Sequence, residues 1–296
     1  MHKMYPNIKN CKFNKPILSH QTGNIILAEY LLSDELFFAA RIGNTEQTIV
    51  KSILIDECSE DMYFKKYPRW WCGYGGRYAG IYPDTYVSLK NFADCYSESL
   101  KNIDLMGVVT SFVDCDVVLN RYCPQAIYFY YSAYESYYFP NNPWTQYLKD
   151  KTVLVIHPFE KSIKNNFLNR AELFKNTNIL PDFNLVTFKA HQNIGKENSD
   201  WFESFNIMKG EISKLKFDIA IIGCGAFGIP LGSFIKSHMN KSSIHMGGAL
   251  QLLFGILGNR WRNNQQLLPY VNSYWTNPLP EETPEKHDLV EKSCYW

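Results

Sequence analysis

The stretch that decides the fold reads KFDIAIIGCGAFGIPL and covers residues 216–231. Its apolar, β-branched run 219–222 is typical of a strand that is buried on both faces of a sheet. Glycines follow this run in a G-x-G-x-x-G spacing: Gly223, Gly225 and Gly228. Pro230 comes next, in a first helical turn that tolerates its missing N–H, and a helix is predicted over 229–238.

The next segment completes a strand–helix–strand unit. Residues 242–246 predict a second strand, which ends at Gly247. Backbone N–H groups and the positive end of the helix dipole would face an anion at the glycine turn. Glycines that merely let the helix pack closely on the strand are the alternative, but the strand–turn–helix context favours an anion site.

The charges around this turn indicate which anion it would bind. No Asp or Glu occurs from 219 to 280, whereas a dinucleotide site usually has an acidic residue about 20 residues past the glycines, to hold the ribose. The same window holds four basic residues: Lys236, Lys241, Arg260 and Arg262. The pattern therefore favours a site that binds phosphate groups and lacks the acidic residue that holds the ribose in dinucleotide sites.

Composition sets the outer limits. The chain has 296 residues with 46% hydrophobic and 20% charged residues, which is enough apolar material for a large core. A net charge of +1 argues against a nucleic-acid binder. The 8 cysteines form no C-x-x-C pair, which predicts reduced thiols in the cytoplasm, without a zinc ribbon. No secretory signal and no transmembrane run of about 18 apolar residues is visible.

Strands and helices alternate from 36 to 258, which predicts an α/β fold: a Rossmann-like, mostly parallel sheet with helices on both faces. We expect one domain over 1–268, with an irregular N-terminal arm at 1–21. The chain turns polar and proline-rich from 269, which predicts a C-terminal tail over 269–296, and its part 281–296 is expected to be either mobile or a peripheral helix.

Two further strand ends lead into helices. Arg41 follows a strand at 36–40, and Glu46 precedes a helix at 47–55 that Asn44 or Thr45 would cap. Because open α/β sheets bind ligands at the carboxyl ends of their strands, Arg41 and Glu46 are site candidates. The alternative explanation of Glu46 is structural: an acidic residue in the first turn of a helix interacts favourably with the helix dipole.

The second such place follows the strand 152–156. His157 ends that strand, and Ser162 lies near the start of a helix at 163–173. His157 either donates to a phosphate or bonds to backbone, and the sequence leaves both open.

Two weaker patterns complete the candidates. Asp114 and Asp116 lie in a predicted extended run 106–118, where a D-x-D spacing places both carboxylates on one strand face and suits a divalent cation; solvated edge acids are the usual explanation. Trp70 and Tyr74 lie in a loop rich in glycine and aromatics, which either stacks on sugar rings or is pinned by its own side chains.

Three segments together resemble the GT-D type glycosyltransferases of bacterial polysaccharide synthesis. Residues 40–46 read ARIGNTE and are similar to the Arg-hydrophobic-Gly-x-x-Glu motif of that family, and 143–159 resemble its middle segment. Residues 223–231 (GCGAFGIPL) and 245–261 resemble its C-terminal half. Order and spacing agree over most of 36–261.

The resemblance implies a Rossmann-like fold and transfer of a sugar from a nucleotide donor, with a UDP-sugar expected, to a glycan acceptor. The family's D-x-E motif, associated with the metal and donor site, corresponds here to Asn44-Thr45-Glu46. An amide is a poorer cation ligand than a carboxylate, so dependence on Mn²⁺ or Mg²⁺ stays open, with Asp114 or Asp116 as the second carboxylate.

The candidates have the following roles. Glu46, as base or metal ligand, and Asp116 are the catalytic candidates, and Trp70 and Tyr74 are the acceptor candidates. The donor-binding candidates are Arg41, Gly43, Asn44, His157, Ser162, Gly223, Gly225, Gly228, His245 and Gly247. The glycine turn, Arg41 and His245 would hold the diphosphate. A Rossmann-type oxidoreductase and a non-catalytic nucleotide- or sugar-binding module are the alternatives. We expect a cytoplasmic protein, free or peripheral at the membrane, and leave open whether it forms a homodimer.

Overall fold

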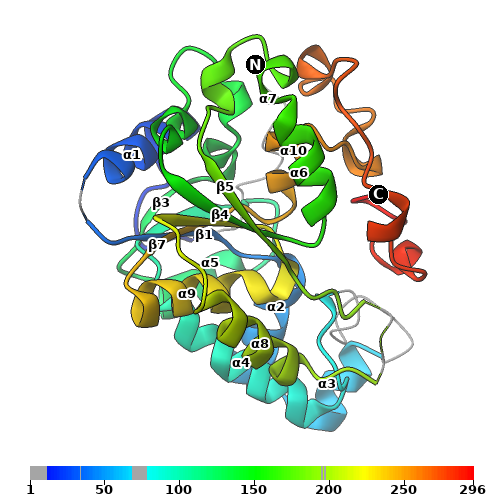
Figure 1. Cartoon of the computed structure of the whole chain (residues 1–296). Helices are drawn as coiled ribbons and strands as arrows, with labels where there is room; N and C mark the ends of the chain where they lie inside the picture. The colour runs from blue at the N-terminus through cyan, green and yellow to red at the C-terminus, as the bar shows by residue number, and fades with distance from the viewer. Residues whose placement is uncertain (1–11, 34, 69–78, 195, 197) are drawn as a thin grey trace.

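A single parallel sheet runs through the molecule (Figure 1). The computed structural model describes residues 12–33, 35–68, 79–194, 196 and 198–296. Its sheet has seven strands in the order β3-β2-β1-β7-β6-β4-β5, and every neighbouring pair is parallel. The strands are β1 (Phe38–Arg41), β2 (Leu105–Val108), β3 (Ile127–Tyr130), β4 (Thr152–His157), β5 (Asn184–Lys189), β6 (Ile219–Ile222) and β7 (Ser242–His245).

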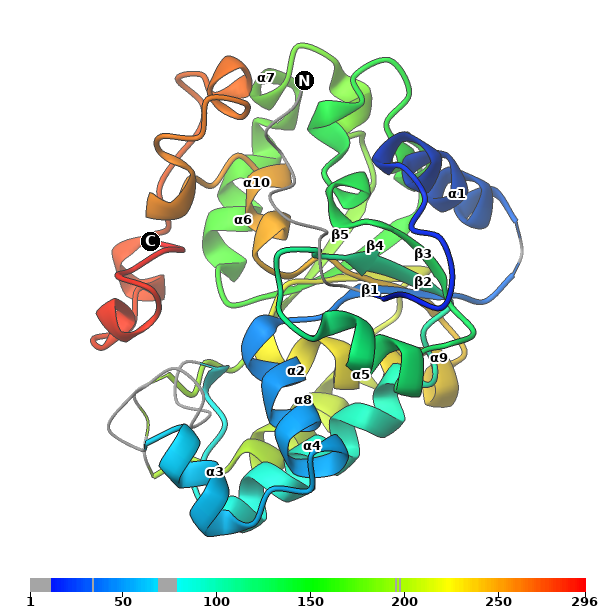
Figure 2. The same ribbon diagram turned by 180° about the vertical axis from the view of Figure 1, so that it is seen from behind.

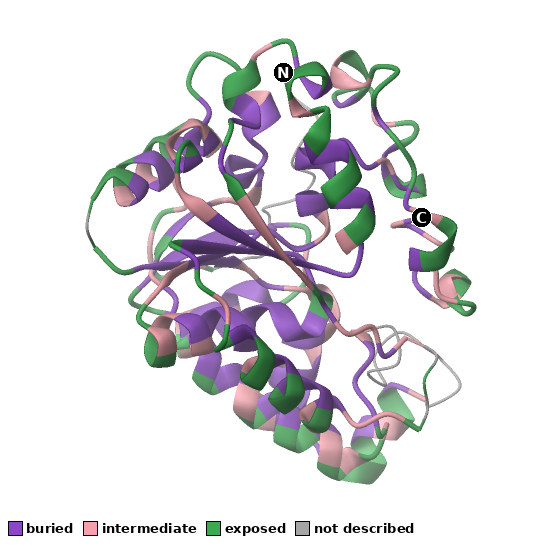
Figure 3. Cartoon of the chain, in the orientation of Figure 1, coloured by how far each residue is buried: buried purple, intermediate pink, exposed green. Residues whose placement is uncertain are grey.

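Alternating side chains of each central strand enter two separate cores. Ile219 and Ile221 of β6 belong to one hydrophobic cluster, whereas Ala220 and Ile222 belong to the other. All four are at most 3% exposed, and Figure 3 shows the central strands buried. Continuous apolar runs are what a sheet covered on both faces requires. The predicted α/β, Rossmann-like fold is confirmed.

The helices form a layer on each side of this sheet (Figures 1 and 2). One cluster contains side chains of α2 (Asn44–Val50), α4 (Tyr86–Leu100), α5 (Cys115–Tyr122), α8 (Trp201–Ile212) and α9 (Gly228–Met239), with α3 (Glu60–Lys66) at its end. The other contains side chains of α1 (His20–Leu32), α6 (Glu160–Leu168), α7 (Arg170–Leu173) and α10 (Leu250–Leu253). Among the described residues, no helix has the length and apolarity that crossing a bilayer requires.

Several predicted boundaries differ from the structure. The extended run 106–118 is wrong beyond Val108, because Asp114 has a left-handed backbone (φ 61°) and α5 begins at the next residue. Helix α2 begins at Asn44 with Gly43 as its N-cap, so neither Asn44 nor Thr45 caps it. The predicted helix 163–173 instead begins at Glu160, and Asn169 divides it into α6 and α7.

The chain after 269 is packed against the domain. Residues 280–296, which we call the C-terminal segment, run through short 3₁₀ turns at Pro280–Glu282 and His287–Leu289. Cys294 and Trp296 are 4% and 7% exposed and belong to the cluster that contains α6 and α10. A continuous peripheral helix is therefore not formed, and the segment shares the core of the domain.

Part of the predicted N-terminal arm is also ordered against the sheet. Leu18 forms a parallel bridge with Phe129 of β3, and its N–H donates to the Tyr128 carbonyl over 2.8 Å. Ser19 then caps α1 by accepting from the Thr22 N–H. Leu18 of the arm thus pairs with the edge strand β3.

Candidate functional site

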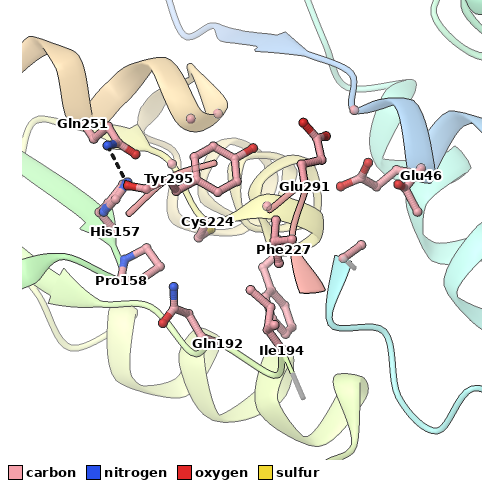
Figure 4. A pocket seen from close by; sticks show the side chains of 18 of the residues that line it. Glu46, His157, Pro158, Gln192, Ile194, Cys224, Phe227, Gln251, Glu291 and Tyr295 are labelled. Carbon is pink, nitrogen blue, oxygen red and sulfur yellow. Dashed lines mark hydrogen bonds between the residues drawn. The ribbon is translucent and has the colours of Figure 1, made fainter. Parts of the chain in front are cut away.

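A pocket of about 550 Å³ opens at the carboxyl ends of the central strands (Figure 4). Four strand ends contribute to its lining: Arg41 of β1, His245 of β7, Gly223 after β6 and His157 of β4. Strands β1 and β7 are neighbours, yet the chain continues from β1 to β2 on one side and reaches β7 from β6 on the other. Such a point, where the strand order reverses, is where open α/β sheets bind ligands.

The glycine turn combines close packing with an open face. A Cβ on Gly223 would lie 2.8 Å from the Gly247 carbonyl oxygen and 2.8 Å from His157 Cδ2, so this position has no room for a side chain. Gly225 has φ +56° and open space in front of its Cα. A 3₁₀ turn at Gly225–Phe227 then leads into α9, whose first residue, Gly228, lies directly against the His245 ring. Close packing therefore explains Gly223 and Gly228, and the anion site at the open face of Gly225 stays a prediction.

His245 presents a hydrogen-bond acceptor to the pocket. Its Nδ1 lies 3.2 Å from the Ile222 carbonyl oxygen, which only accepts, so Nδ1 carries the proton. Burial, with the nearby Arg41 charge, lowers the pKa of His245 to about 3, against the hydrogen bond to Ile222. The ring is therefore neutral at pH 7 and its Nε2 holds a lone pair. Among the described residues Nε2 has no hydrogen-bond partner, although His245 is only 4% exposed.

His157 has a hydrogen-bond donor where His245 has an acceptor. The Phe159 N–H donates to its Nδ1 over 2.9 Å, so the neutral ring carries its proton on Nε2. Burial lowers the pKa of His157 to about 3, which keeps the ring neutral. This backbone bond was one of the two roles that the sequence left open. Among the described residues Nε2–H has no hydrogen-bond acceptor, so it remains able to donate to a ligand and both roles are compatible.

Arg41 brings a positive charge into the site, near the buried Glu46 and Glu135. Its Nε is buried and has no hydrogen-bond partner, and no ion pair joins its guanidinium to any residue of the described chain. Gly247 has φ +62°, and a Cβ there would lie 2.8 Å from Nε, so this glycine makes room for the Arg41 side chain. A buried donor without a partner costs free energy, which a bound anion would recover.

Glu46 lies near Arg41 on the first turn of α2. It is 8% exposed, and its carboxylate folds back against Gly43, where any side chain would overlap it. Burial raises the pKa of Glu46, whereas a hydrogen bond from its own backbone N–H and the Arg41 charge act in the opposite direction. The carboxylate therefore has the position of a helix cap and also lines the pocket.

The structure brings most of the predicted donor-binding residues together. The pocket lining includes Arg41, Gly43, Asn44, Glu46, His157, Gly223, Gly225, His245 and Gly247. Gly228 supports the His245 ring from behind. Trp70 and Tyr74 lie outside the described residues.

Ser162 and Asp116 point elsewhere. The Ser162 hydroxyl contacts the Glu282 carboxylate, which also accepts from the Ser162 N–H over 3.2 Å and from the Lys161 N–H over 2.6 Å. The N-terminus of α6 is thus occupied by an acidic side chain of the same chain. Asp116 accepts from the Lys12 N–H over 2.6 Å, and neither Ser162 nor Asp116 lines the pocket.

The described acidic residues do not form a cation site. Asp114 lies 3.6 Å from Lys51 on the outside of α5, and Asp116 is engaged with Lys12, so neither adds a carboxylate beside Glu46. In the described ranges no three His, Cys, Asp or Glu side chains gather as a metal site. Asn44 stands where the glycosyltransferase motif that residues 40–46 resemble has an acid. Glu46 and Glu291 are the carboxylates that line the pocket among the described residues, and Glu291 is paired with Arg260 over 2.6 Å, so the described lining offers no group of acids that is free to hold Mn²⁺ or Mg²⁺ by itself.

The sequence missed the wall that the C-terminal segment contributes. Val290, Glu291, Tyr295 and Trp296 line the pocket, and Figure 4 shows Tyr295 and Glu291 on the wall formed by this segment. The available signal was the pair Tyr295-Trp296 after a polar stretch, since large aromatics at the end of a polar segment usually pack against something.

We compared the chain with protein-family models, curated proteins and solved structures, and none of them matches it. The class that fold and site define is an α/β protein with a parallel sheet and a polar pocket at the carboxyl edge of its central strands.

Proposed function

We propose that this protein transfers a sugar from a nucleoside diphosphate sugar, with UDP as the expected nucleotide, to a hydroxyl of a glycan acceptor. The observation that carries the proposal is Arg41, whose buried Nε has no hydrogen-bond partner among the described residues and which lines the same pocket as the buried Glu46 and the glycine turn. A positive charge, a glycine turn at a helix N-terminus and a carboxylate are features that suit diphosphate departure and proton removal.

The leaving diphosphate would be held by three groups. Arg41 supplies the charge, the turn at Gly225 and the N-terminus of α9 supply backbone dipoles, and His157 supplies its Nε2–H. His245 is better matched to a hydroxyl than to the diphosphate, because its Nε2 has no proton to donate. This assignment revises the role that the sequence suggested for His245.

Glu46 would act as the general base. The acceptor oxygen forms a bond to the anomeric carbon, the bond from that carbon to the diphosphate oxygen breaks, and the acceptor proton passes to Glu46. Burial raises the pKa of Glu46 and makes it a stronger base than an exposed carboxylate. No step is routed through a metal ion; a cation bound here would have Glu46 and the phosphates of the donor as its ligands.

Two other functions are less well supported. In an oxidoreductase of the dinucleotide-binding type, the strand after the glycine-turn helix usually ends in an acid, but β7 ends in His245. A non-catalytic binding module would use the same pocket without turnover. The proposed setting is the cytoplasm, free or at the membrane surface, in the synthesis of a surface polysaccharide or glycoprotein glycan.

The test begins with a thermal-shift screen of UDP-, GDP-, CMP- and dTDP-sugars with and without Mn²⁺, followed by donor-hydrolysis and transfer assays. Glu46→Gln should lower turnover at least about 100-fold, while UDP affinity changes little. Glu98→Gln, which alters only a surface pair with Lys101, is the control.

Unchanged turnover in Glu46→Gln would rule out Glu46 as the base. Binding without any turnover in the wild type would favour the binding module, and NAD(P)H binding detected by fluorescence would favour the oxidoreductase.

A further inference from the structure

The C-terminal segment is bound to the frame of the pocket through its backbone. The Asn259 N–H donates to the Trp296 carbonyl and the Arg260 N–H to the Cys294 carbonyl, both over 2.9 Å. The Gln251 side-chain amide donates to the Tyr295 carbonyl over 3.1 Å. Because these bonds join the segment to residues that follow β7, the segment and the carboxyl edge of the sheet form one wall.

Two glycines provide the space in which the segment sits. A Cβ on Gly258 would lie 2.5 Å from the Tyr295 carbonyl oxygen and 2.8 Å from that of Cys294. A Cβ on Gly248 would overlap the edge of the Tyr295 ring. Neither glycine has a positive φ, so packing against the segment, rather than backbone conformation, explains the absence of a side chain.

Side chains fix the segment at both of its ends. Glu282, 4% exposed, binds the first turn of α6 through Lys161 and Ser162, as described above. At the other end, Arg260 pairs with Glu291 over 2.6 Å, and its guanidinium carbon lies 4.8 Å from the centre of the Tyr295 ring. Tyr295 is thereby held in the pocket wall.

We propose that the C-terminal segment is a required part of the ligand site, which binds a nucleoside diphosphate only when the segment is seated on Gly258, and that Tyr295 is the segment's contact with that ligand. This inference rests on the proposed function, because it takes the occupant of the pocket to be the nucleotide donor. An aromatic side chain contacting a planar base or a sugar ring contributes about 1–3 kcal/mol to binding, or about 5- to 150-fold in affinity.

The first test disturbs the packing of the C-terminal segment on Gly258 without changing a residue that lines the pocket. Gly258 does not line the pocket, and Gly258→Ala places a methyl group against the backbone of the segment. We expect faster hydrogen exchange at Arg260 and over 290–296, unchanged exchange in β4 and β6, and UDP affinity at least about tenfold weaker by calorimetry. Gly210→Ala is the matched control, because a Cβ at Gly210 has nothing within 4 Å.

The second test changes the Tyr295 side chain and keeps the backbone hydrogen bonds of the segment. The bond from Gln251 goes to the Tyr295 carbonyl, which Tyr295→Ala and Tyr295→Phe both retain. UDP should bind Tyr295→Ala at least about fivefold more weakly than wild type, and Tyr295→Phe nearly as well, while alanine at the exposed Tyr274 changes nothing.

The outcomes separate this inference from the proposed function. If the wild type binds UDP but Gly258→Ala binds it equally well, or shows no faster exchange, the required seating is refuted and the donor site stands. If Tyr295→Ala binds UDP like the wild type, the contact is refuted. A wild type that binds none of the four nucleotides refutes the proposed function, and this inference with it.

Discussion

Replacing Arg41 by glutamine should separate ligand binding from stability. The Arg41 guanidinium forms no ion pair with any described residue, and its Nε is buried without a hydrogen-bond partner among them. Arg41→Gln therefore removes a charge without breaking a bond within the described chain. What it does remove is the favourable field at Glu46 and Glu135, whose pKa values Arg41 lowers.

The expected size of the effect follows from this geometry. A hydrogen bond to a charged group contributes about 1.5–3 kcal/mol, so losing one to the diphosphate should weaken UDP binding by about 10- to 150-fold. The loss of field at two buried acids is offset by the relief of a buried, unpaired donor. Thermal stability should accordingly change by less than about 4 °C.

Calorimetric titration of UDP and thermal denaturation test this prediction. Both are measured at about pH 7.5, which lies about one unit above the reference pKa of histidine. Arg121→Gln makes the same charge change at the exposed C-terminal end of α5 and serves as the control. Arg41→Lys should recover only part of the affinity, because an ammonium lacks the planar fork of donors. Unchanged UDP affinity in Arg41→Gln, with binding intact in the wild type, would refute the assignment of Arg41 to the diphosphate.

Two further predictions concern the histidines and the glycine turn. Burial lowers the pKa of His157 to about 3, below the value of about 6.5 in an unfolded chain, so the unfolded state binds more protons below pH 6.5 and stability falls as pH falls. His157→Asn keeps the acceptor for the Phe159 N–H but does not titrate. Between pH 7 and pH 5, the free energy of unfolding of the wild type relative to this variant, measured by chemical denaturation, should decrease by about 2 kcal/mol. Parallel pH profiles of the two proteins would contradict a buried neutral ring. Gly228→Ala pushes a methyl group into the His245 ring and should cost about 1–3 kcal/mol, whereas Gly210→Ala, in open space on α8, should stabilise by about 0.5–1 kcal/mol; equal melting temperatures for the two variants would show that the ring moves aside freely.

The sequence by itself determined the sheet and one edge of the site. Apolar runs such as 219–222 predict buried strands because the side-chain pattern of a strand is local. The residue after a strand in a parallel sheet lies at the carboxyl edge, whichever strands are neighbours. Arg41, His157 and His245 could therefore be assigned to one edge before their order in the sheet was known.

Only the tertiary structure decided which further residues complete the site at that edge and which candidate residues lie elsewhere. Glu282 occupies the N-terminus of α6 from 120 residues further along the chain, and Asp116 meets Lys12 across 104 residues. Such pairs cannot be predicted from the spacing of residues along the chain, because they depend on where separate elements pack. The C-terminal segment is the clearest case: its polar composition suggested a tail, yet Gly258 and Gly248 leave the space in which it lies, and Tyr295 becomes part of the pocket.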